Sequence, residues 1–373
     1  MGWIVSKKPS SDESDRVRLH RVVLDDLRRG DLRRTFHRDL RDIYSFYLDE
    51  ESRTRLASMG RLKRWLFLVG WLAKSLFLNL SPVRRILLLV SVLFFFQGGV
   101  VFRSGNQEWT LRLAPLAFLI LLFILMLELK DKLLAREEFA IGRAVQMALL
   151  PVDCPQLAGW DLWLYTRPAN DVGGDLVDYL RLEHGRLGLA LGDVAGKGLG
   201  AALLMSKLQA TIRAIATETA SLADLGAKLN VIFCRDQVPG RYATLVYLEI
   251  GPDSGAVRVL NAGHLPPVVV GRLGSIPMEP ASPPVGLLPG TTYVQQQVEL
   301  EPLDSLLVYS DGITEARNAQ GEFFGEERLM QLLPLLRDRS ARDSAAVILS
   351  EVERFVGEER YADDLSVIVL KRV

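Results

Sequence analysis

The sequence lacks several features that mark other classes of protein. Of its 373 residues only two are cysteine, and Lys+Arg balance Asp+Glu at 45 each. Two cysteines are too few for a disulfide framework, so we expect reduced thiols in a cytosolic domain. The zero net charge gives no electrostatic sign of nucleic-acid binding. The sequence also has no Gly-rich loop ending in Lys-Ser or Lys-Thr, so nucleotide-driven phosphoryl transfer would lack its phosphate cradle.

Residues 1–64 are polar and contain more Lys and Arg than Asp and Glu. Apolar residues recur there at intervals of three and four positions, which is a helical period. This pattern predicts a charged helical arm on the cytoplasmic side. No apolar core lies near Met1, so the sequence predicts no cleavable signal peptide.

Two apolar runs without a charged residue follow, at residues 86–102 and 113–127, and a short polar loop separates them. A membrane-spanning helix needs about 17–25 apolar residues, so the pair predicts a transmembrane hairpin whose charged flanks reach the interfaces. Lys and Arg are more frequent outside the pair than in the loop, which places both flanks in the cytoplasm. The sequence therefore predicts a multi-pass protein of the cell inner (cytoplasmic) membrane, with residues 65–127 as the membrane region.

The segments on either side of the hairpin leave alternatives open. Residues 65–83 are apolar but contain Lys74, and they are interpreted as an interfacial helix on the cytoplasmic leaflet, with a third span as the alternative. Residues 128–150 keep a helical period up to Pro151. They predict a helical linker, which is either a parallel coiled coil in a homodimer or a rigid connector in a monomer.

Residues 151–373 combine short apolar runs, turn residues and segments with a helical period. We expect antiparallel strands at residues 160–166, 176–182, 187–191, 242–250, 256–262, 267–270, 293–300, 305–309 and 365–370. We expect helices at residues 201–218, 221–234, 326–336 and 345–356. Grouped strands followed by helix pairs indicate an α+β fold rather than alternating α/β. The compact solution is an αββα sandwich of two antiparallel sheets flanked by helix pairs.

Four acidic turns organise this last domain. They contain Asp175, Asp193, Asp311 and Asp363, and each Asp follows or precedes an apolar run and has Gly, Ala or Ser nearby. Mg²⁺ and Mn²⁺ take oxygen ligands, and small neighbours let backbone and water approach the cation. A single Asp-Gly pair often marks an ordinary turn. Four such turns in one domain favour a metal site.

The motifs are Val172-Gly-Gly-Asp175-x-x-Asp178, Gly192-Asp193-Val-x-Gly196-x-Gly198, Asn261-Ala-Gly-His264, Ser310-Asp311-Gly312-x-x-Glu315 and Asp363-Asp364-x-Ser366. In this order they resemble the bacterial metal-dependent (PPM, type 2C-like) serine/threonine phosphatases. The branch is that of sporulation stage II protein E and the stress-response phosphatases that regulate sigma factors. The resemblance covers about residues 140–373, and it implies the αββα fold that the strand and helix pattern indicates independently.

The resemblance also implies roles for particular residues. Asp193 would bridge two Mn²⁺ or Mg²⁺ ions, Asp175 and the carbonyl of Val194 would complete one ion, and Asp311 and Asp363 would complete the other. Two such ions activate a water for attack on phosphorus and stabilise the developing charge. Further residues near the motifs keep open roles: Asp178 and Asp364 as partners that orient the ligands, Lys197 without a role, Arg167 as a candidate for the substrate phosphate, and His264 as a structural residue or a proton donor.

The function that follows is a membrane-anchored protein serine/threonine phosphatase in signal transduction. By resemblance, its substrate would be phosphoserine or phosphothreonine on an anti-anti-sigma-type regulator. A catalytically inactive sensor or scaffold of the same fold is one alternative. A diguanylate cyclase is another, because Gly173-Gly174-Asp175 opens that signature, but Leu176-Val177 stands where Glu-Phe is required.

Overall fold

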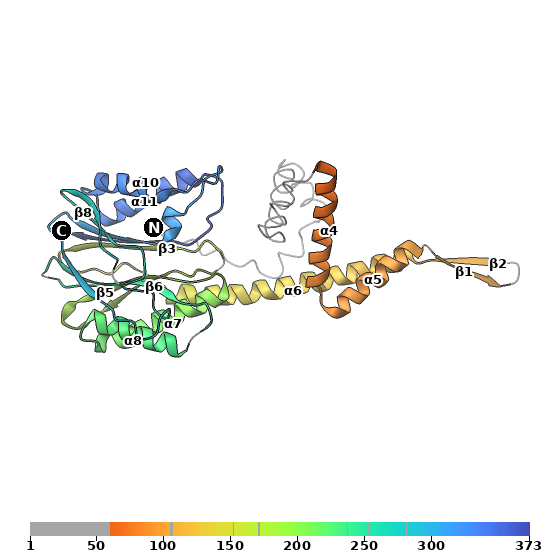
Figure 1. Ribbon diagram of the computed structural model, residues 1–373, viewed down its shortest axis with the longest axis horizontal. Helices are drawn as coiled ribbons and strands as arrows, with labels where there is room; N and C mark the ends of the chain where they lie inside the picture. Colours follow the sequence, from red (N-terminus) through yellow and green to blue (C-terminus); the bar gives the residue numbers. More distant parts are fainter. Residues whose placement is uncertain are drawn as a thin grey trace, which may run out of the picture. The chain divides into compact units, whose positions relative to one another are not determined.

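The computed structural model describes residues 60–373, apart from positions 98, 105, 106, 152, 171, 237, 253 and 281 (Figure 1). The chain divides into two compact units, Met1–Lys130 and Asp131–Val373, and the division falls within one long helix, α6 (Ala114–Leu149). The expected charged arm at residues 1–64 lies almost entirely outside the described residues.

The first unit contains two helices, a hairpin and the start of α6. Helix α4 (Arg61–Asn79) precedes α5 (Pro82–Gln97), and the strands β1 (Gly99–Ser104) and β2 (Gln107–Arg112) pair antiparallel. The hydroxyl of Ser91 in α5 donates a hydrogen bond to the carbonyl of Ala117 in α6 at 2.9 Å. A salt bridge between Arg84 and Glu128 joins the same two helices.

The predicted membrane hairpin is wrong. Among the described residues, no helix is both long enough and apolar enough to cross a membrane. Helix α5 has 16 residues because the chain leaves the helix after Gln97, and the rest of the first apolar run pairs as strand β1. Helix α6 is long, but Glu128 ends its apolar part within its first half. The expected transmembrane helices in residues 65–127 and the multi-pass inner-membrane location are therefore not supported. The interfacial helix expected at residues 65–83 stays a prediction, and α4 covers most of that range.

The second unit is the expected αββα sandwich. One five-stranded sheet has the order β10 (Gln295–Glu299), β7 (Ala256–Ala262), β6 (Ala243–Ile250), β5 (Leu187–Val194) and β4 (Leu176–Arg181). The other has the order β3 (Trp160–Arg167), β12 (Leu365–Arg372), β11 (Ser305–Tyr309), β8 (Val268–Gly271) and β9 (Gly274–Pro277). All these neighbours pair antiparallel.

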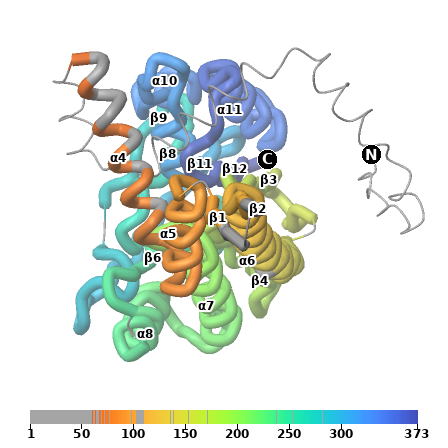
Figure 2. The backbone as a smooth tube through the Cα atoms, turned by 90° about the vertical axis from the view of Figure 1, so that its right-hand side faces the viewer, coloured from red at the N-terminus to blue at the C-terminus, as the bar shows by residue number. Residues whose placement is uncertain are grey.

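Helices cover both outer faces (Figures 1 and 2). Helices α7 (Leu199–Ile215) and α8 (Leu222–Arg235) pack on the β6 sheet, and Met205, Leu208 and Leu229 are fully buried there. Helices α10 (Gly325–Leu332) and α11 (Ala341–Val356) pack on the other sheet. A third apolar cluster fills the space between the two sheets. Burial on both faces explains why the central strands are continuous apolar runs in the sequence.

Local signals set the helix boundaries close to the expected ones. The Ser221 hydroxyl accepts a hydrogen bond from the Asp224 amide and caps α8, and Ser340 does the same for α11 through Asp343. The sequence did not predict the short strand β9 or the four-residue helix α9 (Asp311–Thr314). Helix α6 continues to Leu149, as the helical period before Pro151 indicated.

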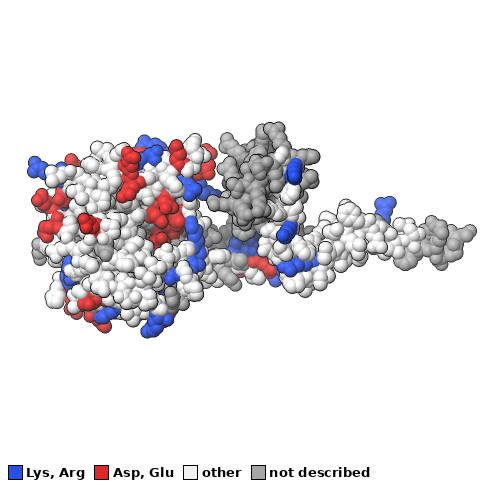
Figure 3. Space-filling model, viewed as in Figure 1, with Lys and Arg blue, Asp and Glu red and all other residues white. Residues whose placement is uncertain are grey.

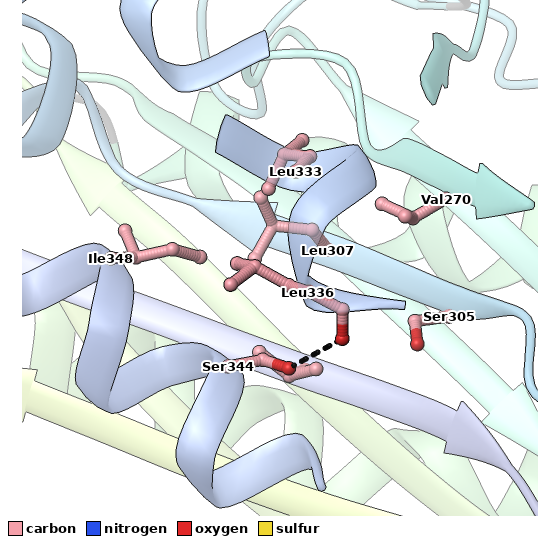
Figure 4. Close-up of a pocket in the computed structure, with 8 residues that line it drawn as sticks. Val270, Ser305, Leu307, Leu333, Leu336, Ser344 and Ile348 are labelled. Carbon is pink, nitrogen blue, oxygen red and sulfur yellow. Dashed lines mark hydrogen bonds between the residues drawn. The ribbon is translucent and has the colours of Figure 1, made fainter. Parts of the chain in front are cut away.

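A small cavity of about 20 Å³ lies between the second sheet and its helices (Figure 4). Its lining is mostly apolar and includes Leu307, Leu336 and Ile348, and the Ser344 hydroxyl beside it donates to the Leu336 carbonyl at 3.3 Å. A cavity of this size holds about one water molecule. None of the four acidic turns lines it, so it belongs to the packing of the core.

Candidate active site

The four acidic turns meet at one edge of the sandwich. Strands β4 and β5 are antiparallel neighbours, so Asp175, just before β4, lies close to Asp193 near the end of β5. In the facing sheet, Asp311 follows β11 and Asp363 precedes β12, and these strands are also antiparallel neighbours. Figure 3 shows acidic side chains gathered in one patch on this unit, beside Lys and Arg side chains. The fold thus brings together residues that are far apart in the sequence.

Asp364 fastens the turn that precedes β4. Its Oδ1 accepts a hydrogen bond from the Ala169 amide at 2.7 Å, and its Oδ2 accepts from the amides of Gly174 at 2.6 Å and Asp175 at 3.2 Å. A Cβ atom at Gly173 would lie 2.6 Å from Oδ2, so a side chain there would clash with the carboxylate. Burial raises the pKa of Asp364, and these three amides oppose the shift. Asp364 is therefore an orienting residue, which was one of the roles considered for it.

Asp175 is tied to the opposite sheet. The Ser366 hydroxyl of β12 donates a hydrogen bond to Asp175 Oδ2 at 2.5 Å. The carboxyl group is buried, and burial, followed by the charge of Asp364, raises the pKa of Asp175 well above its usual value. Ionising a buried carboxylate close to other carboxylates costs free energy through lost hydration and through repulsion between the like charges. A bound cation offsets both costs.

Asp193 and Asp311 are crowded by other carboxylates. Burial, followed by the charges of Asp311 and Asp363, raises the pKa of Asp193 to about 6. The pKa of Asp311 is raised by burial and then by Asp363 and Glu315, whereas Lys197 lowers it. These mutual effects place at least three carboxylates from three turns within electrostatic range of one another.

The carboxylate oxygens of these side chains fit divalent cations in chemistry, although the side chains do not form a closed set of ligands. Among the described residues, no three or more His, Cys, Asp or Glu side chains are grouped closely enough to hold a metal ion. Unneutralised carboxylates repel one another, which favours such separation. A Cβ atom at Gly174 would lie 3.3 Å from Asp193 Oδ1 and 3.5 Å from the Val194 carbonyl oxygen. The absence of a side chain at Gly174 therefore leaves space beside the two oxygens expected to share one ion.

Asp178 does not face the acidic cluster. Its carboxylate is almost fully buried and binds Arg213 of α7 through both oxygens, at 2.7 Å to Nε and 2.8 Å to Nη2. This bidentate pair joins β4 to α7. Asp178 thus fastens β4 to helix α7, and its carboxylate is engaged by Arg213. This contact fits the expectation that Asp178 orients other residues and does not bind the metal itself.

Gln146 and Gln209 connect helix α6 to the site. The buried Gln146 amide group donates to the Gly173 carbonyl at 2.7 Å and accepts from the Gly173 amide at 3.0 Å. Gln209 of α7 donates to the Leu149 carbonyl at 2.8 Å. The last turns of α6 therefore hold the glycine pair that precedes Asp175. In the sequence, Gln146 begins the stretch Gln146-x-x-Leu149-Leu150-Pro151, and nothing in that local pattern relates it to Gly173.

Arg167 is occupied elsewhere. Its guanidinium pairs with Glu353 at 2.8 Å and stacks on the ring of Tyr361. These contacts fix the side chain between β3 and α11, so they do not favour Arg167 as the group that holds a substrate phosphate.

His264 is enclosed between the two sheets. Its Nε2 lies 3.1 Å from the Tyr309 carbonyl and its Nδ1 lies 2.8 Å from the Thr244 hydroxyl. A carbonyl only accepts, so Nε2 carries the proton and Nδ1 accepts from Thr244. Burial lowers the pKa of His264 to about 4, which keeps the ring neutral. Both nitrogens are engaged in the interior, which supports the structural role over the proton donor.

Arg241 is a cation near the site that the sequence did not single out. Its Nη1 donates to the Ala195 carbonyl at 2.6 Å, and a Cβ atom at Gly196, whose φ is 114°, would lie 1.3 Å from the same nitrogen. The guanidinium thus lies on the turn between Asp193 and Lys197. The remaining N–H groups of Arg241 have no partner among the described residues. No local motif marks this position, because the contact depends on the pairing of β5 with β6.

Comparison with known proteins identifies the family. Residues 183–373 match the family described as stage II sporulation protein E (SpoIIE). The chain belongs to this family. The expected phosphatase branch is thereby confirmed, and the match covers three of the four acidic turns of this SpoIIE-family chain.

Curated relatives carry the same domain. The chain is 30% identical over 234 residues to protein IcfG of Synechocystis, which covers 55% of this chain and 37% of IcfG. It is 25% identical over 239 residues to the phosphoserine phosphatase RsbU of Bacillus subtilis, which covers 64% of this chain and 70% of RsbU. The match to IcfG thus spans little more than a third of that protein. The names of RsbU and of RsbP, another phosphoserine phosphatase of Bacillus subtilis, agree with the predicted protein serine/threonine phosphatase class.

Solved structures agree with the fold. The RsbU and RsbW domains of a Mycobacterium tuberculosis protein match with a TM-score of 0.51 and 26% identity, over 60% of this chain and 63% of that one. The SiaA-PP2C domain of Pseudomonas aeruginosa matches with a TM-score of 0.55 and 17% identity, over 65% of this chain and 98% of that one. At that identity the second similarity concerns the fold alone.

Proposed function

We propose that this SpoIIE-family chain is a metal-dependent phosphatase that removes phosphate from serine or threonine on a regulatory protein. The observation that supports the proposal best is the electrostatic convergence of the candidate ligands. The charges of Asp311 and Asp363 act on Asp193, and that of Asp193 acts on Asp175. The Val194 carbonyl oxygen and Asp193 Oδ1 both lie next to Gly174.

The proposed ligands divide between the two sheets. Asp193 would contact two Mn²⁺ or Mg²⁺ ions, Asp175 and the Val194 carbonyl would bind one, and Asp311 and Asp363 would bind the other. Two ions held in this way lower the pKa of water and neutralise charge that develops on phosphoryl oxygens. The protein orients these oxygens: Asp364 holds the turn before Asp175 through backbone amides, and Ser366 fixes the Asp175 carboxylate.

Arg241 is the side chain that we propose for the substrate phosphate. It lies on the turn that follows Asp193, and within the described part of the chain only Nη1 has a hydrogen-bond partner. A guanidinium offers several donors in a fixed plane, which suits a phosphate group. Arg167 is less suited to this role because its guanidinium pairs with Glu353 and stacks on the ring of Tyr361.

The proposed substrate is a phosphorylated anti-anti-sigma-type regulator. Support comes from RsbU and RsbP, which are named phosphoserine phosphatases, and from the solved structure that contains RsbU and RsbW domains. An inactive sensor or scaffold of the same fold is the alternative. The presence of Asp175, Asp193, Asp311 and Asp363 at one edge of the sandwich favours turnover.

A second copy of the chain is the proposed partner of residues 128–150. Several apolar side chains of this part of α6 are exposed, namely Leu129, Leu133, Leu134, Ile141, Val145 and Met147. Exposed apolar residues along a helix favour pairing with another helix, because pairing removes them from water. We propose this linker and the phosphatase domain at 151–373 as separate functional parts.

Turnover of a phosphoserine peptide by the purified chain tests the function. Activity should require Mn²⁺ or Mg²⁺, and the variant Asp193→Asn should be inactive. Full activity in excess chelator would contradict the proposal. Phosphoproteome comparison of cells with the native chain and with Asp193→Asn would then identify the regulator that loses phosphate.

A further inference from the structure

Lys197 forms a cross-sheet contact with one of the candidate metal ligands, Asp363. Its ammonium lies 3.0 Å from Asp363 Oδ2 and 2.8 Å from the Ala362 carbonyl oxygen. Lys197 belongs to the turn after β5, whereas Asp363 precedes β12 in the other sheet. A side chain from the turn that carries Asp193 therefore already binds a carboxylate expected to hold the second ion.

The charge of Lys197 reaches a second candidate ligand. It acts on Asp311 and lowers its pKa, against the larger opposing effects of burial, Asp363 and Glu315. The ammonium thus interacts with both carboxylates that the same divalent cation would require. It supplies one positive charge where that cation would supply two.

The contact is also easy to break. The Lys197 side chain is 63% exposed, that of Asp363 is 38% exposed, and the lysine stem is flexible. Gly196 and Gly198 flank Lys197 with φ values of 114° and 75°, so no side chain on either neighbour confines it. An exposed ion pair of this kind shifts an equilibrium by about fivefold or less.

We infer that Lys197 is a tethered counter-ion of the candidate metal centre: its ammonium occupies Asp363 in the metal-free protein, and the second divalent cation must displace it. This inference rests on the proposed metal-dependent function. It implies that the two ions bind with different affinities, because only the one at Asp311 and Asp363 competes with a cation built into the chain.

Metal titration of the full chain tests this inference without any measurement of catalysis. The chain is stripped with chelator, dialysed and titrated with Mn²⁺ by calorimetry, and free Mn²⁺ is followed by electron paramagnetic resonance. Lys197→Met removes the charge and keeps the length of the side chain. Lys197→Arg keeps the charge. Lys207→Met is the matched control, because Lys207 and Asp236 form a surface pair at the same distance of 3.0 Å.

We expect two binding steps in the wild-type chain. In Lys197→Met the weaker step should tighten by about three- to tenfold, because both the ion pair and the repulsion between cations disappear. The stronger step should change little, and Lys197→Arg and Lys207→Met should both resemble the wild type.

The possible failures are distinct. If Lys197→Met leaves the weaker step unchanged or weakens it, or if Lys197→Arg tightens it equally, the counter-ion role is refuted while the metal-dependent function stands. If the wild-type chain binds no Mn²⁺, the proposed function itself fails, and the inference fails with it.

Discussion

Replacing Asp193 by Asn removes one negative charge from a crowded, partly buried site and keeps the shape of the side chain. In the metal-free protein, the pKa of Asp193 rises from 3.8 to about 6, mainly through burial and then through Asp311 and Asp363. The folded state therefore binds the proton more tightly than the unfolded state. Stability is lost as the pH rises through this range, and above about pH 7 the full cost of the ionised carboxylate is present.

The size of this cost follows from the pKa shift. One pKa unit corresponds to about 1.4 kcal/mol, so the ionised Asp193 destabilises the metal-free fold by at most about 3 kcal/mol. Solvent near the site screens part of the charge, so about 1–3 kcal/mol is expected. In chelator at pH 7.5, Asp193→Asn should therefore be more stable than the wild type by this amount. At pH 4 the two proteins should differ little, because Asp193 is then mostly protonated.

Metal should invert the order of stability. A ligand that binds only the folded state at one hundred times its dissociation constant stabilises that state by about 2.7 kcal/mol. The wild type gains this from Mn²⁺, whereas Asp193→Asn loses a shared ligand and gains less. Urea unfolding of residues 131–373 measures the free energy of unfolding of the wild type and of Asp193→Asn, each with and without Mn²⁺. The variant Asp338→Asn, at an exposed position, serves as a charge-matched control. A variant that is no more stable than the wild type in chelator at pH 7.5 would refute the reasoning.

Three other predictions address different parts of the chain. Burial lowers the pKa of His264 to about 4, so stability should fall by about 3 kcal/mol in total as the pH drops from about 6.5 towards 4, and urea unfolding of His264→Gln should lack this component. Arg241→Ala should raise KM for a phosphopeptide about tenfold or more, with a smaller change in kcat; an unchanged KM would exclude a contact with the substrate phosphate. Charged substitutions at Leu133 and Val145 together should convert a dimer to a monomer in analytical ultracentrifugation, and a chain that is monomeric without them would contradict the proposed pairing.

Local patterns explain what could be predicted from the sequence. The strands of the sandwich are short apolar runs bounded by turn residues, and Ser221 and Ser340 cap helices that start close to their expected positions. The acidic turns were visible because each ligand lies beside small residues at the end of a strand. The division of the ligands between two sheets follows once the strands are paired.

The rest depended on long-range contacts or on a misread apolar run. The pairing of Arg213 with Asp178 and the position of Arg241 beside Ala195 join residues that no local spacing relates. The first predicted span failed because hydropathy was counted from helix α5 into strand β1, and the second because Glu128 ends the apolar part of α6. A glycine followed by β-branched residues such as Val100 is typical of a change from helix to strand, as β1 shows.

The division of the site between two sheets has a consequence for control. Asp175 and Asp193 belong to one sheet, Asp311 and Asp363 to the other, and neither sheet alone has the carboxylates for two ions. Near the site, the two sheets are joined by polar contacts in addition to the apolar cluster between them. These include Ser366 to Asp175, Asp364 to the Gly174 amide, His264 between Thr244 and Tyr309, and the exposed ion pair of Lys197 with Asp363. A small shift of one sheet relative to the other would change these distances and leave the hydrogen bonds between the strands of each sheet intact. Because metal ligand distances tolerate only about 0.2 Å, such a shift would alter metal affinity well before it altered the fold.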